Sequence, residues 1–316
     1  MPFIRYKQKN FRDASMEIIW QAREILDDYE RQGFDLTLRQ LYYQFVSKDL
    51  IPNHQRSYDR LGAIINDARM AGLIDWDHII DRTRNVVQWQ TQQSPAEAAR
   101  AAAERYRRDR WEDQPNHVEV WIEKDALVGV IRPACMELMI PYFSCRGYTS
   151  QSEMWGAAQR LFAAAETGKE VTILHLGDHD PSGIDMTRDI RERLALFMAS
   201  DKFIADGGDS SDAIQWMKDT LTVERIALTM DQVREFRPPP NPAKLSDSRA
   251  DDYIALYGDS SWELDALSPS TLDALIKKHV GELMDSDAYA DQLEREETER
   301  QLMLDAADEW DKRDEG

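Results

Sequence analysis

Two aspartates near the middle of the chain have the type and spacing for chemistry. Asp178 and Asp180 lie in the stretch VTILHLGDHDPSG, residues 171–183, directly after a run of apolar and β-branched residues. Such a run, ending in Gly and Pro, predicts a buried parallel strand followed by a tight loop. On extended backbone the two side chains point the same way, and paired carboxylates favour a divalent cation such as Mg²⁺, or Mn²⁺. The alternative is a loop whose Asp residues cap turns and the next helix.

The segments around this loop alternate between predicted strands and predicted helices. An apolar strand at 118–122 precedes a helix, a second strand ends near a turn at Gly147, and helices are predicted on both sides of the loop. This order predicts an α/β fold with a parallel sheet. Glu123 stands where the first strand ends, at the sheet edge where open α/β proteins bind ligands. If the two strands are neighbours, Glu123, Asp178 and Asp180 converge there.

The N-terminal region is predicted to be helical. Apolar residues recur at helical spacing in residues 15–29, 38–48 and 57–72, and residues 73–85 then alternate like a short strand or wing. Three helices and a short β element form a winged-helix pattern, whose third helix is offered to DNA. The basic residues predicted to contact phosphates are Arg56, Arg60, Arg69, Arg82 and Arg84. A three-helix packing module with a solvated basic face explains the pattern equally well.

The charge of the chain is strongly acidic but unevenly spread. The 316 residues carry a formal net charge of −20, yet residues 1–110 hold 18 basic and 16 acidic residues. Residues 281–316 hold 4 basic and 14 acidic residues, which predicts an acidic helical tail. Because Lys and Arg must meet the phosphates of a nucleic acid, DNA is expected against the N-terminal third of the chain.

Composition also predicts the cellular setting of the protein and its division into regions. Cys135 and Cys145 supply neither a disulfide framework nor a zinc-ligand set, which indicates a reducing setting. No apolar run is long enough for a membrane span, and the N-terminus lacks a signal-peptide core, so a cytoplasmic protein without a membrane partner is expected. Four regions are expected: a DNA-binding domain at 1–93, a linker helix at 94–115, a metal-binding domain with a C-terminal extension at 116–280, and the acidic tail at 281–316.

Four motifs stand in an order that resembles one enzyme family. The chain is similar to the A subunit of topoisomerase VI and its relatives, including the meiotic double-strand-break protein, through TLRQLYYQFV, IEKDA, CRGYTS and LGDHDPSG. The likeness spans roughly residues 30–195 and extends to short phage-type versions without an ATPase partner. It implies a winged-helix domain with a nucleophilic Tyr, followed by a Toprim domain, a Rossmann-like parallel sheet that binds Mg²⁺. It also implies a prokaryotic or phage-type protein associated with the nucleoid.

The resemblance assigns roles to the residues that match the family's motifs. Tyr43, the second Tyr of the pair, would be the nucleophile, Tyr42 would pack in the core, and Arg39 would hold the scissile phosphate. The metal ligands that it implies are Glu123, Asp178 and Asp180. The further DNA contacts that it implies near the site are Lys124 and Arg146, beside Gly147. Ser182 replaces an acidic residue of some Toprim enzymes, so a second metal would be held less firmly, and the acidic tail has no counterpart.

These roles imply a DNA-cleaving transesterase, similar to a type IIB topoisomerase A subunit. The Tyr hydroxyl would attack a phosphodiester neutralised by Mg²⁺ and leave a 5′-phosphotyrosyl link that can be resealed. Cleavage of both strands of duplex DNA needs a homodimer, in which the family sets the tyrosine of one protomer against the metal of the other. The chain has no GxxxxGK[ST] motif, so strand passage would need a separate ATPase subunit.

Other functions fit the same motifs. A Toprim nuclease would use the three carboxylates with a metal-activated water, and Tyr43 would then be dispensable. A non-catalytic DNA-binding or regulatory module is the second alternative. A haloacid-dehalogenase-like phosphatase is disfavoured, because Pro181 and Ser182 intervene where that fold needs Thr or Val.

Overall fold

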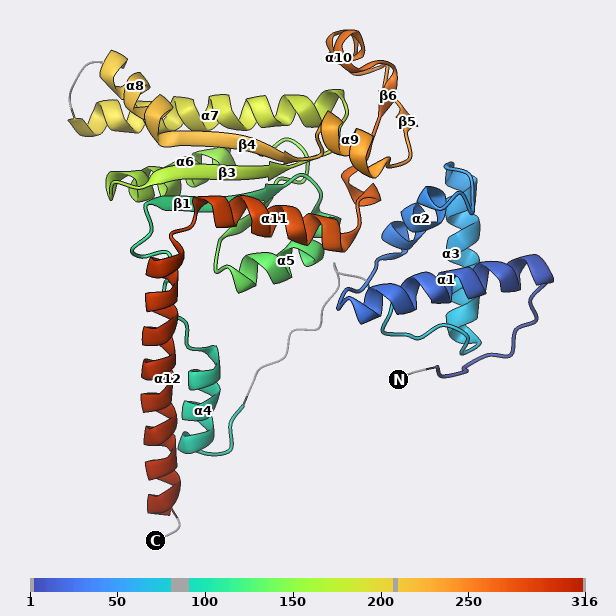
Figure 1. Ribbon diagram of the computed structural model, residues 1–316, viewed down its shortest axis with the longest axis horizontal. Helices are drawn as coiled ribbons and strands as arrows, with labels where there is room; N and C mark the ends of the chain where they lie inside the picture. Colours follow the sequence, from blue (N-terminus) through green and yellow to red (C-terminus); the bar gives the residue numbers. More distant parts are fainter. Residues whose placement is uncertain (1–2, 81–90, 207–209, 315–316) are drawn as a thin grey trace.

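The chain folds into two lobes and a projecting arm. The structure is a computed structural model that describes residues 3–80, 91–206 and 210–314. Residues 3–80 form a helical lobe, residues 116–283 form a sheet lobe, and two helices from the middle and the end of the chain form the arm (Figure 1). The α/β class expected from the sequence is confirmed, since the sheet lobe is built on a parallel sheet flanked by helices.

The helical lobe consists of α1 (Asp13–Arg31), α2 (Leu38–Ser47) and α3 (Gln55–Met70). The three predicted helices are therefore present, and their apolar faces meet in one core that contains Ile19, Leu41 and Leu61. A capping box starts α2, because the Thr37 hydroxyl accepts from the Gln40 backbone N–H at 3.3 Å and the Gln40 amide oxygen accepts from the Thr37 backbone N–H at 2.9 Å. This cap sets the direction of α2, the helix that carries Tyr43.

The predicted wing is only partly within the described residues. Its described part, up to Ile80, forms a single parallel bridge between Leu36 and Ile79 and contains no strand. The rest of the predicted segment, including Arg82 and Arg84, lies outside the described residues.

The sheet lobe is organised around four parallel strands in the order β2 (Tyr142–Ser144), β1 (Asn116–Ile122), β3 (Glu170–Leu176) and β4 (Leu221–Ala227). The register pairs Ile122 with Leu176, so β1 and β3 end side by side. The two strands are thus neighbours, which was the condition for Glu123 to meet the loop after β3. β3 is almost wholly buried, as an apolar strand covered on both faces should be.

Helices cover both faces of this sheet (Figure 1). On one face α5 (Val128–Glu137) and α11 (Pro269–Leu283) pack against Val120 and Leu174. On the other face α6 (Gln151–Glu166), α7 (Pro181–Asp206) and α8 (Ser210–Thr220) enclose a second core around Trp121 and Ile173. Adjacent residues of one strand pack into opposite cores, because side chains alternate between the two faces of a sheet.

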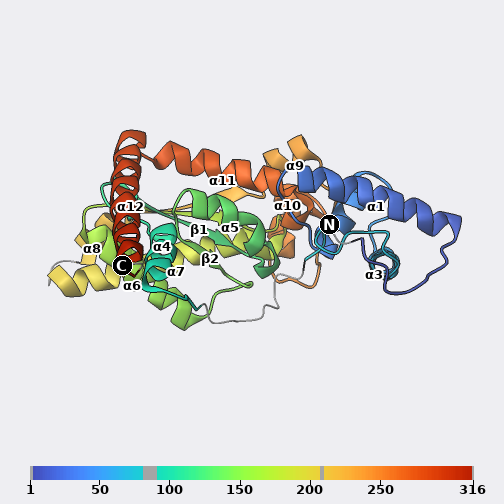
Figure 2. The same cartoon turned by 90° about the horizontal axis from the view of Figure 1, so that it is seen from below.

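A segment after β4 runs from the sheet lobe to the helical lobe. It contains α9 (Met230–Phe236), β5 (Asn241–Pro242), α10 (Ala250–Tyr257), β6 (Ser260–Ser261) and the short η2 (Leu264–Ala266). Its Pro-rich part contributes β5, which pairs with β6. η2 packs on α2, and Ala266 joins the core of the helical lobe. Residues 237–266, here called the connector, therefore hold the two lobes together (Figure 2).

The arm pairs α4 (Pro95–Arg105) with α12 (Ser286–Asp314) (Figure 1). Arg100 contacts Asp308 at 2.7 Å, and Arg110 contacts Glu296 at 2.8 Å. The acidic tail thus packs against the basic linker helix of the same chain. None of the helices that the structure describes combines the length and apolar character that a bilayer crossing requires.

Candidate active site between the helical lobe and the sheet edge

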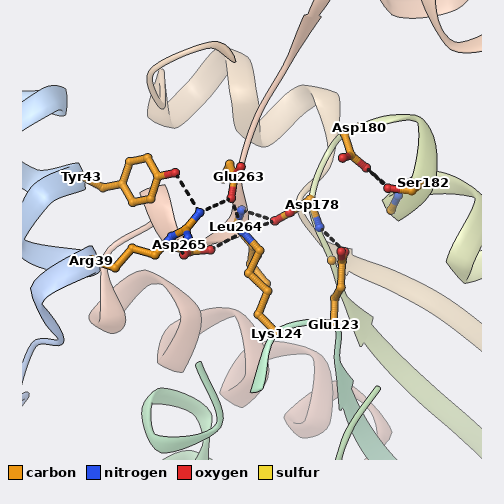
Figure 3. A network of polar contacts seen from close by, with 12 residues as sticks. Arg39, Tyr43, Glu123, Lys124, Asp178, Asp180, Ser182, Glu263, Leu264 and Asp265 are labelled. Atoms are coloured by element: carbon orange, nitrogen blue, oxygen red, sulfur yellow. Dashed lines mark hydrogen bonds and ion pairs between the residues drawn. The ribbon is translucent and has the colours of Figure 1, made fainter. Parts of the chain in front are cut away.

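Glu123 and the loop at 177–183, here called the acidic loop, meet where β1 and β3 end. The Glu123 backbone N–H donates to the Leu176 carbonyl at 2.8 Å, which continues the β1–β3 pairing by one residue. The Glu123 carboxylate then accepts from the Asp178 backbone N–H at 2.8 Å. Figure 3 shows this side chain directed at the loop rather than away from it. The parallel register is the cause, because it brings the two strand ends to the same edge.

The two aspartates of the acidic loop have different partners (Figure 3). One Asp180 oxygen accepts from the Ser182 hydroxyl at 2.9 Å and from the Gly183 backbone N–H at 2.6 Å, which caps the start of α7. One Asp178 oxygen accepts from the Leu264 backbone N–H at 2.8 Å and contacts the Lys124 ammonium at 2.9 Å. The capping interpretation therefore describes Asp180, whereas Asp178 faces the connector and Lys124.

Two carboxylates that the sequence analysis missed complete this edge. Glu263 and Asp265 in the connector lie near Asp178, so that one oxygen from each of the three is within 4.8 Å of the others. Among the described residues, Glu123 and Asp180 do not share a cluster of this kind with Asp178. The signal in the sequence was the WELDA motif, which spaces Glu263 and Asp265 two apart just as DHD spaces its aspartates.

Lys124 neutralises part of this cluster. Its ammonium donates to Glu263 and Asp265 and lies 2.9 Å from Asp178. The carboxylates raise the pKa of Lys124 above its usual value although burial opposes this, so the ammonium stays charged. The expected DNA contact at Lys124 is therefore directed inward, at carboxylates of its own chain.

The pKa values of the acidic groups at this edge shift in opposite directions. Burial, together with Glu123 and Glu263, raises the pKa of Asp178 to about 7, although Lys124 opposes the shift. Burial also raises the pKa of Glu123, and nearby Asp180 adds to it. Burial acts likewise on Glu263, but Lys124 and Arg39 outweigh it and lower the pKa of that carboxyl. The ionised forms of Asp178 and Glu123 are thus disfavoured, and a bound cation would favour them.

Arg225, which the sequence analysis also missed, fixes the backbone of the acidic loop through hydrogen bonds to its carbonyl groups. It donates to the carbonyls of Gly177 at 2.8 Å and Gly183 at 2.9 Å, and also to the Asp178 carbonyl. Burial lowers the pKa of this guanidinium to about 10, so it remains a cation near neutral pH. A fork of N–H donors on several carbonyls holds the loop in one shape.

Tyr43 lies on α2 opposite the connector. The Arg39 guanidinium donates to the Tyr43 hydroxyl at 3.5 Å, and the same side chain contacts Glu263 at 3.2 Å and Asp265 at 3.0 Å. Burial, and then Glu263, raise the pKa of Tyr43 although Arg39 lowers it. Tyr42 is buried in the lobe and donates to the Asn53 amide oxygen at 2.9 Å, in keeping with the packing role expected for it.

A cavity of about 320 Å³ lies between the lobes and is here called the inter-lobe cavity. The predicted nucleophile and both aspartates of the acidic loop line it, together with Arg39 and Glu263. Tyr58, Trp262 and Lys244 form other parts of its wall. A single chain therefore brings Tyr43 and Asp178 to one cavity.

The other predicted DNA contacts have mixed surroundings. Arg56 and Arg60 are exposed on α3. Arg146 is exposed and contacts Asp125 at 3.1 Å. Arg69 is used internally, because it donates to the carbonyls of Trp76 at 2.8 Å and Ile79 at 3.2 Å and stacks on the Trp76 ring. A contact between Arg69 and a DNA phosphate would require these internal hydrogen bonds to break.

The donor chemistry at this edge fits a hard divalent cation. The cluster found among the described residues offers carboxylate oxygens, which Mg²⁺ and Mn²⁺ prefer, and burial, together with Glu123 and Glu263, raises the pKa of Asp178. Comparison with known proteins adds no assignment, since no protein-family model and no curated protein matches the chain.

Proposed function

We propose that this chain is a Mg²⁺-dependent DNA-cleaving transesterase in which Tyr43 is the nucleophile. One observation carries the proposal, namely that the Tyr43 side chain, Arg39 and Asp178 line the same cavity. In this proposal the helical lobe acts as a winged-helix-like DNA-binding domain and the sheet lobe as a Toprim-like domain. The resemblance of LRQLYY, IEKDA and GDHDPSG to the topoisomerase VI A subunit family supports the same roles.

The protein's own residues supply positioning and charge. A tyrosine hydroxyl titrates near pH 10, and burial raises the pKa of Tyr43 further, so the attack needs a cation beside the phenol. Arg39 lies at that place and can also donate to the non-bridging oxygens of a phosphate. In the reaction the Tyr43 hydroxyl gives up its proton to water and a bond forms between its oxygen and phosphorus. The bond to the 3′ oxygen breaks, and this leaving oxygen takes up a proton from water.

The carboxylates at the sheet edge would hold the metal. Glu123, Asp178 and Asp180 are the proposed ligands. Glu263 and Asp265 also lie near Asp178, but both are paired with cations of the protein itself. When bound, Mg²⁺ would neutralise the phosphate and stabilise the departing 3′ oxygen. In this proposal the substrate is duplex DNA, and cleavage of both of its strands requires a homodimer. Strand passage would additionally require a separate ATPase subunit.

Trapping the covalent product tests this proposal. The protein is incubated with plasmid and Mg²⁺, quenched with detergent, and the DNA is assayed for covalently bound protein. The wild type and a Tyr42→Phe control, which keeps the neighbouring ring, should yield protein-linked breaks, and Tyr43→Phe should yield none. Breaks without bound protein, retained in Tyr43→Phe, contradict the transesterase.

One observation favours a second candidate, a nuclease with water as nucleophile. Tyr43 is only 5% exposed and burial raises its pKa, which disfavours the phenolate and favours a metal-activated water as the nucleophile. Both functions require the acidic loop, so Asp178→Ala with Asp180→Ala should abolish breakage in either case. DNA retention without any breakage would instead indicate a binding module.

A further inference from the structure

The proposed nucleophile faces an anion that belongs to the protein. The Glu263 carboxylate, 26% exposed, lies between two cations from different lobes, Arg39 on α2 and Lys124 after β1 (Figure 3). Its neighbour Asp265 also pairs with Arg39, at 3.0 Å, but its side chain is only 3% exposed. Asp265 is thus a buried structural partner, whereas Glu263 lines the inter-lobe cavity.

The position of Glu263 coincides with the place that a reacting phosphate must take. The Arg39 Nη2 atom lies 3.5 Å from the Tyr43 hydroxyl and 3.2 Å from the Glu263 carboxylate. A phosphate held by this guanidinium and attacked by this phenol must contact both groups, and Glu263 already occupies the same Nη2 atom that donates to the phenol. Carboxylates and phosphates use the same Arg geometry, so one can replace the other.

We propose that Glu263 is an internal substitute for a DNA phosphate, and that a phosphodiester displaces it from Arg39 and Lys124 when DNA binds. The inference rests on the proposed function and adds a control step to that site. A phosphodiester carries one negative charge, as the carboxylate does, so the exchange leaves both cations paired. Without DNA, Glu263 pairs with both cations, the half-exposed Arg39 and the largely buried Lys124, in addition to their contacts with Asp265.

The closing of the site by Glu263 has a measurable consequence. DNA must compete with the Glu263 carboxylate, which already occupies Arg39 and Lys124. Removing the charge of Glu263 should therefore strengthen DNA binding, although other carboxylates remain nearby. Loss of any carboxylate near a phosphate weakens repulsion in general, so displacement is identified by the dependence of the gain on Arg39.

The experiment measures binding of a fluorescein-labelled DNA duplex by anisotropy, in EDTA and at low salt, with the full chain. Glu263→Gln should bind about three- to tenfold more tightly than the wild type, as expected for the loss of one partly screened competing charge. Glu235→Gln is the matched control, because Glu235 is an exposed residue of α9 and its substitution changes the net charge equally. It should alter binding less than about twofold.

Two further variants make the result specific. Glu263→Asp keeps the charge and should bind DNA as the wild type does, and its thermal midpoint shows whether the position tolerates change. In an Arg39→Gln background, Glu263→Gln should lose most of its gain, because the cation for which the two anions compete is absent. A gain that persists in that background overturns the proposal.

Glu263→Gln binding no tighter than Glu235→Gln, or weaker than the wild type, also overturns it. Failure of the displacement can be distinguished from failure of the proposed function, because covalent trapping and metal-free binding are independent measurements. Protein-linked breaks with no gain in Glu263→Gln reject the displacement and keep the transesterase. A clear gain without any covalent product rejects the transesterase and keeps the phosphate site.

Discussion

Lys124 illustrates how much of this site depends on single side chains. Its ammonium satisfies carboxylates from the acidic loop and from the connector, which are 85 or more residues apart in the chain. A buried cation with several carboxylates is costly to lose, since each partner would keep its desolvation penalty without the attraction. At this scale the site is a balance between carboxylates and the cations Lys124, Arg39 and Arg225.

The pH dependence of stability tests this balance at Asp178. Burial raises the pKa of Asp178 to about 7 from an ordinary 3.8, so the folded protein binds its proton more tightly than the unfolded chain does. This residue therefore contributes most stability below about pH 4, and the contribution is lost as the pH rises to 7. Asp178→Asn should match the wild type near pH 4 and be the more stable protein at pH 8, in EDTA. Urea unfolding at both pH values measures the difference.

Asp185 provides a control of opposite sign. Burial would raise its pKa, but Tyr148 and Arg188 outweigh burial and hold the pKa below its ordinary value. Its ionised form thus stabilises the folded protein at neutral pH and the effect fades as the pH falls through the lowered pKa. Asp185→Asn should be less stable than the wild type at pH 8. The same sign for both variants would contradict the assignment.

At the scale of elements, the junction between the acidic loop and α7 has the tightest geometry. Gly183 lies in the first turn of α7, where a Cβ atom would come within 2.2 Å of the Asp178 carbonyl oxygen. The Asp180 carboxylate caps the same turn, and Arg225 holds the carbonyls around it. The helix can therefore start directly at the sheet edge, which keeps the loop short and its aspartates in place.

A methyl group at this junction should break it. Gly183→Ala should destabilise the fold by about 3 kcal/mol or more, because the contact is with backbone that cannot move freely. Gly156→Ala is the control in α6, where nothing lies within 4 Å of the added atom, and it should stabilise by about 0.5–1 kcal/mol. Denaturant midpoints of both variants measure the contrast. Equal tolerance of both changes would show that the loop is not held as described.

At the scale of the whole molecule, charge is separated between the helical lobe and the arm. The formal net charge is −20, but residues 281–316 carry much of the excess acid, and Arg100, Arg108 and Arg110 of the linker region already pair with α12. Those arginines are therefore occupied within the arm. Arg56 and Arg60 of the helical lobe are exposed and remain the proposed DNA contacts.

The salt dependence of DNA binding tests this division of charge. Each phosphate contact steepens the slope of log K against log salt by about 0.9, so the Arg56→Gln and Arg60→Gln double variant should have a slope shallower by about 2. Arg132→Gln with Arg234→Gln, two exposed arginines of the sheet lobe, removes the same charge elsewhere and should leave the slope nearly unchanged. Equal effects of both pairs would reject a DNA surface on α3.

Local sequence patterns determined much of this protein. The helices of the first lobe, the parallel strands and the meeting of Glu123 with the acidic loop all followed from apolar periodicity and strand order, because burial of apolar faces dictates these elements. Glu123, Asp178 and Asp180 were singled out by their places at strand ends, whereas the roles proposed for Tyr43 and Arg39 came from the resemblance to the topoisomerase VI A subunit family.

The tertiary structure alone decided which charges meet. Glu263 and Asp265 reach Asp178 and Arg39 through a connector without apolar periodicity, and Lys124 turns inward to join them. Arg225 and Arg69 likewise found backbone carbonyls that no local pattern specifies. The physical reason is that ion pairs between distant segments depend on how two lobes pack, whereas periodicity records only which face of each element is buried.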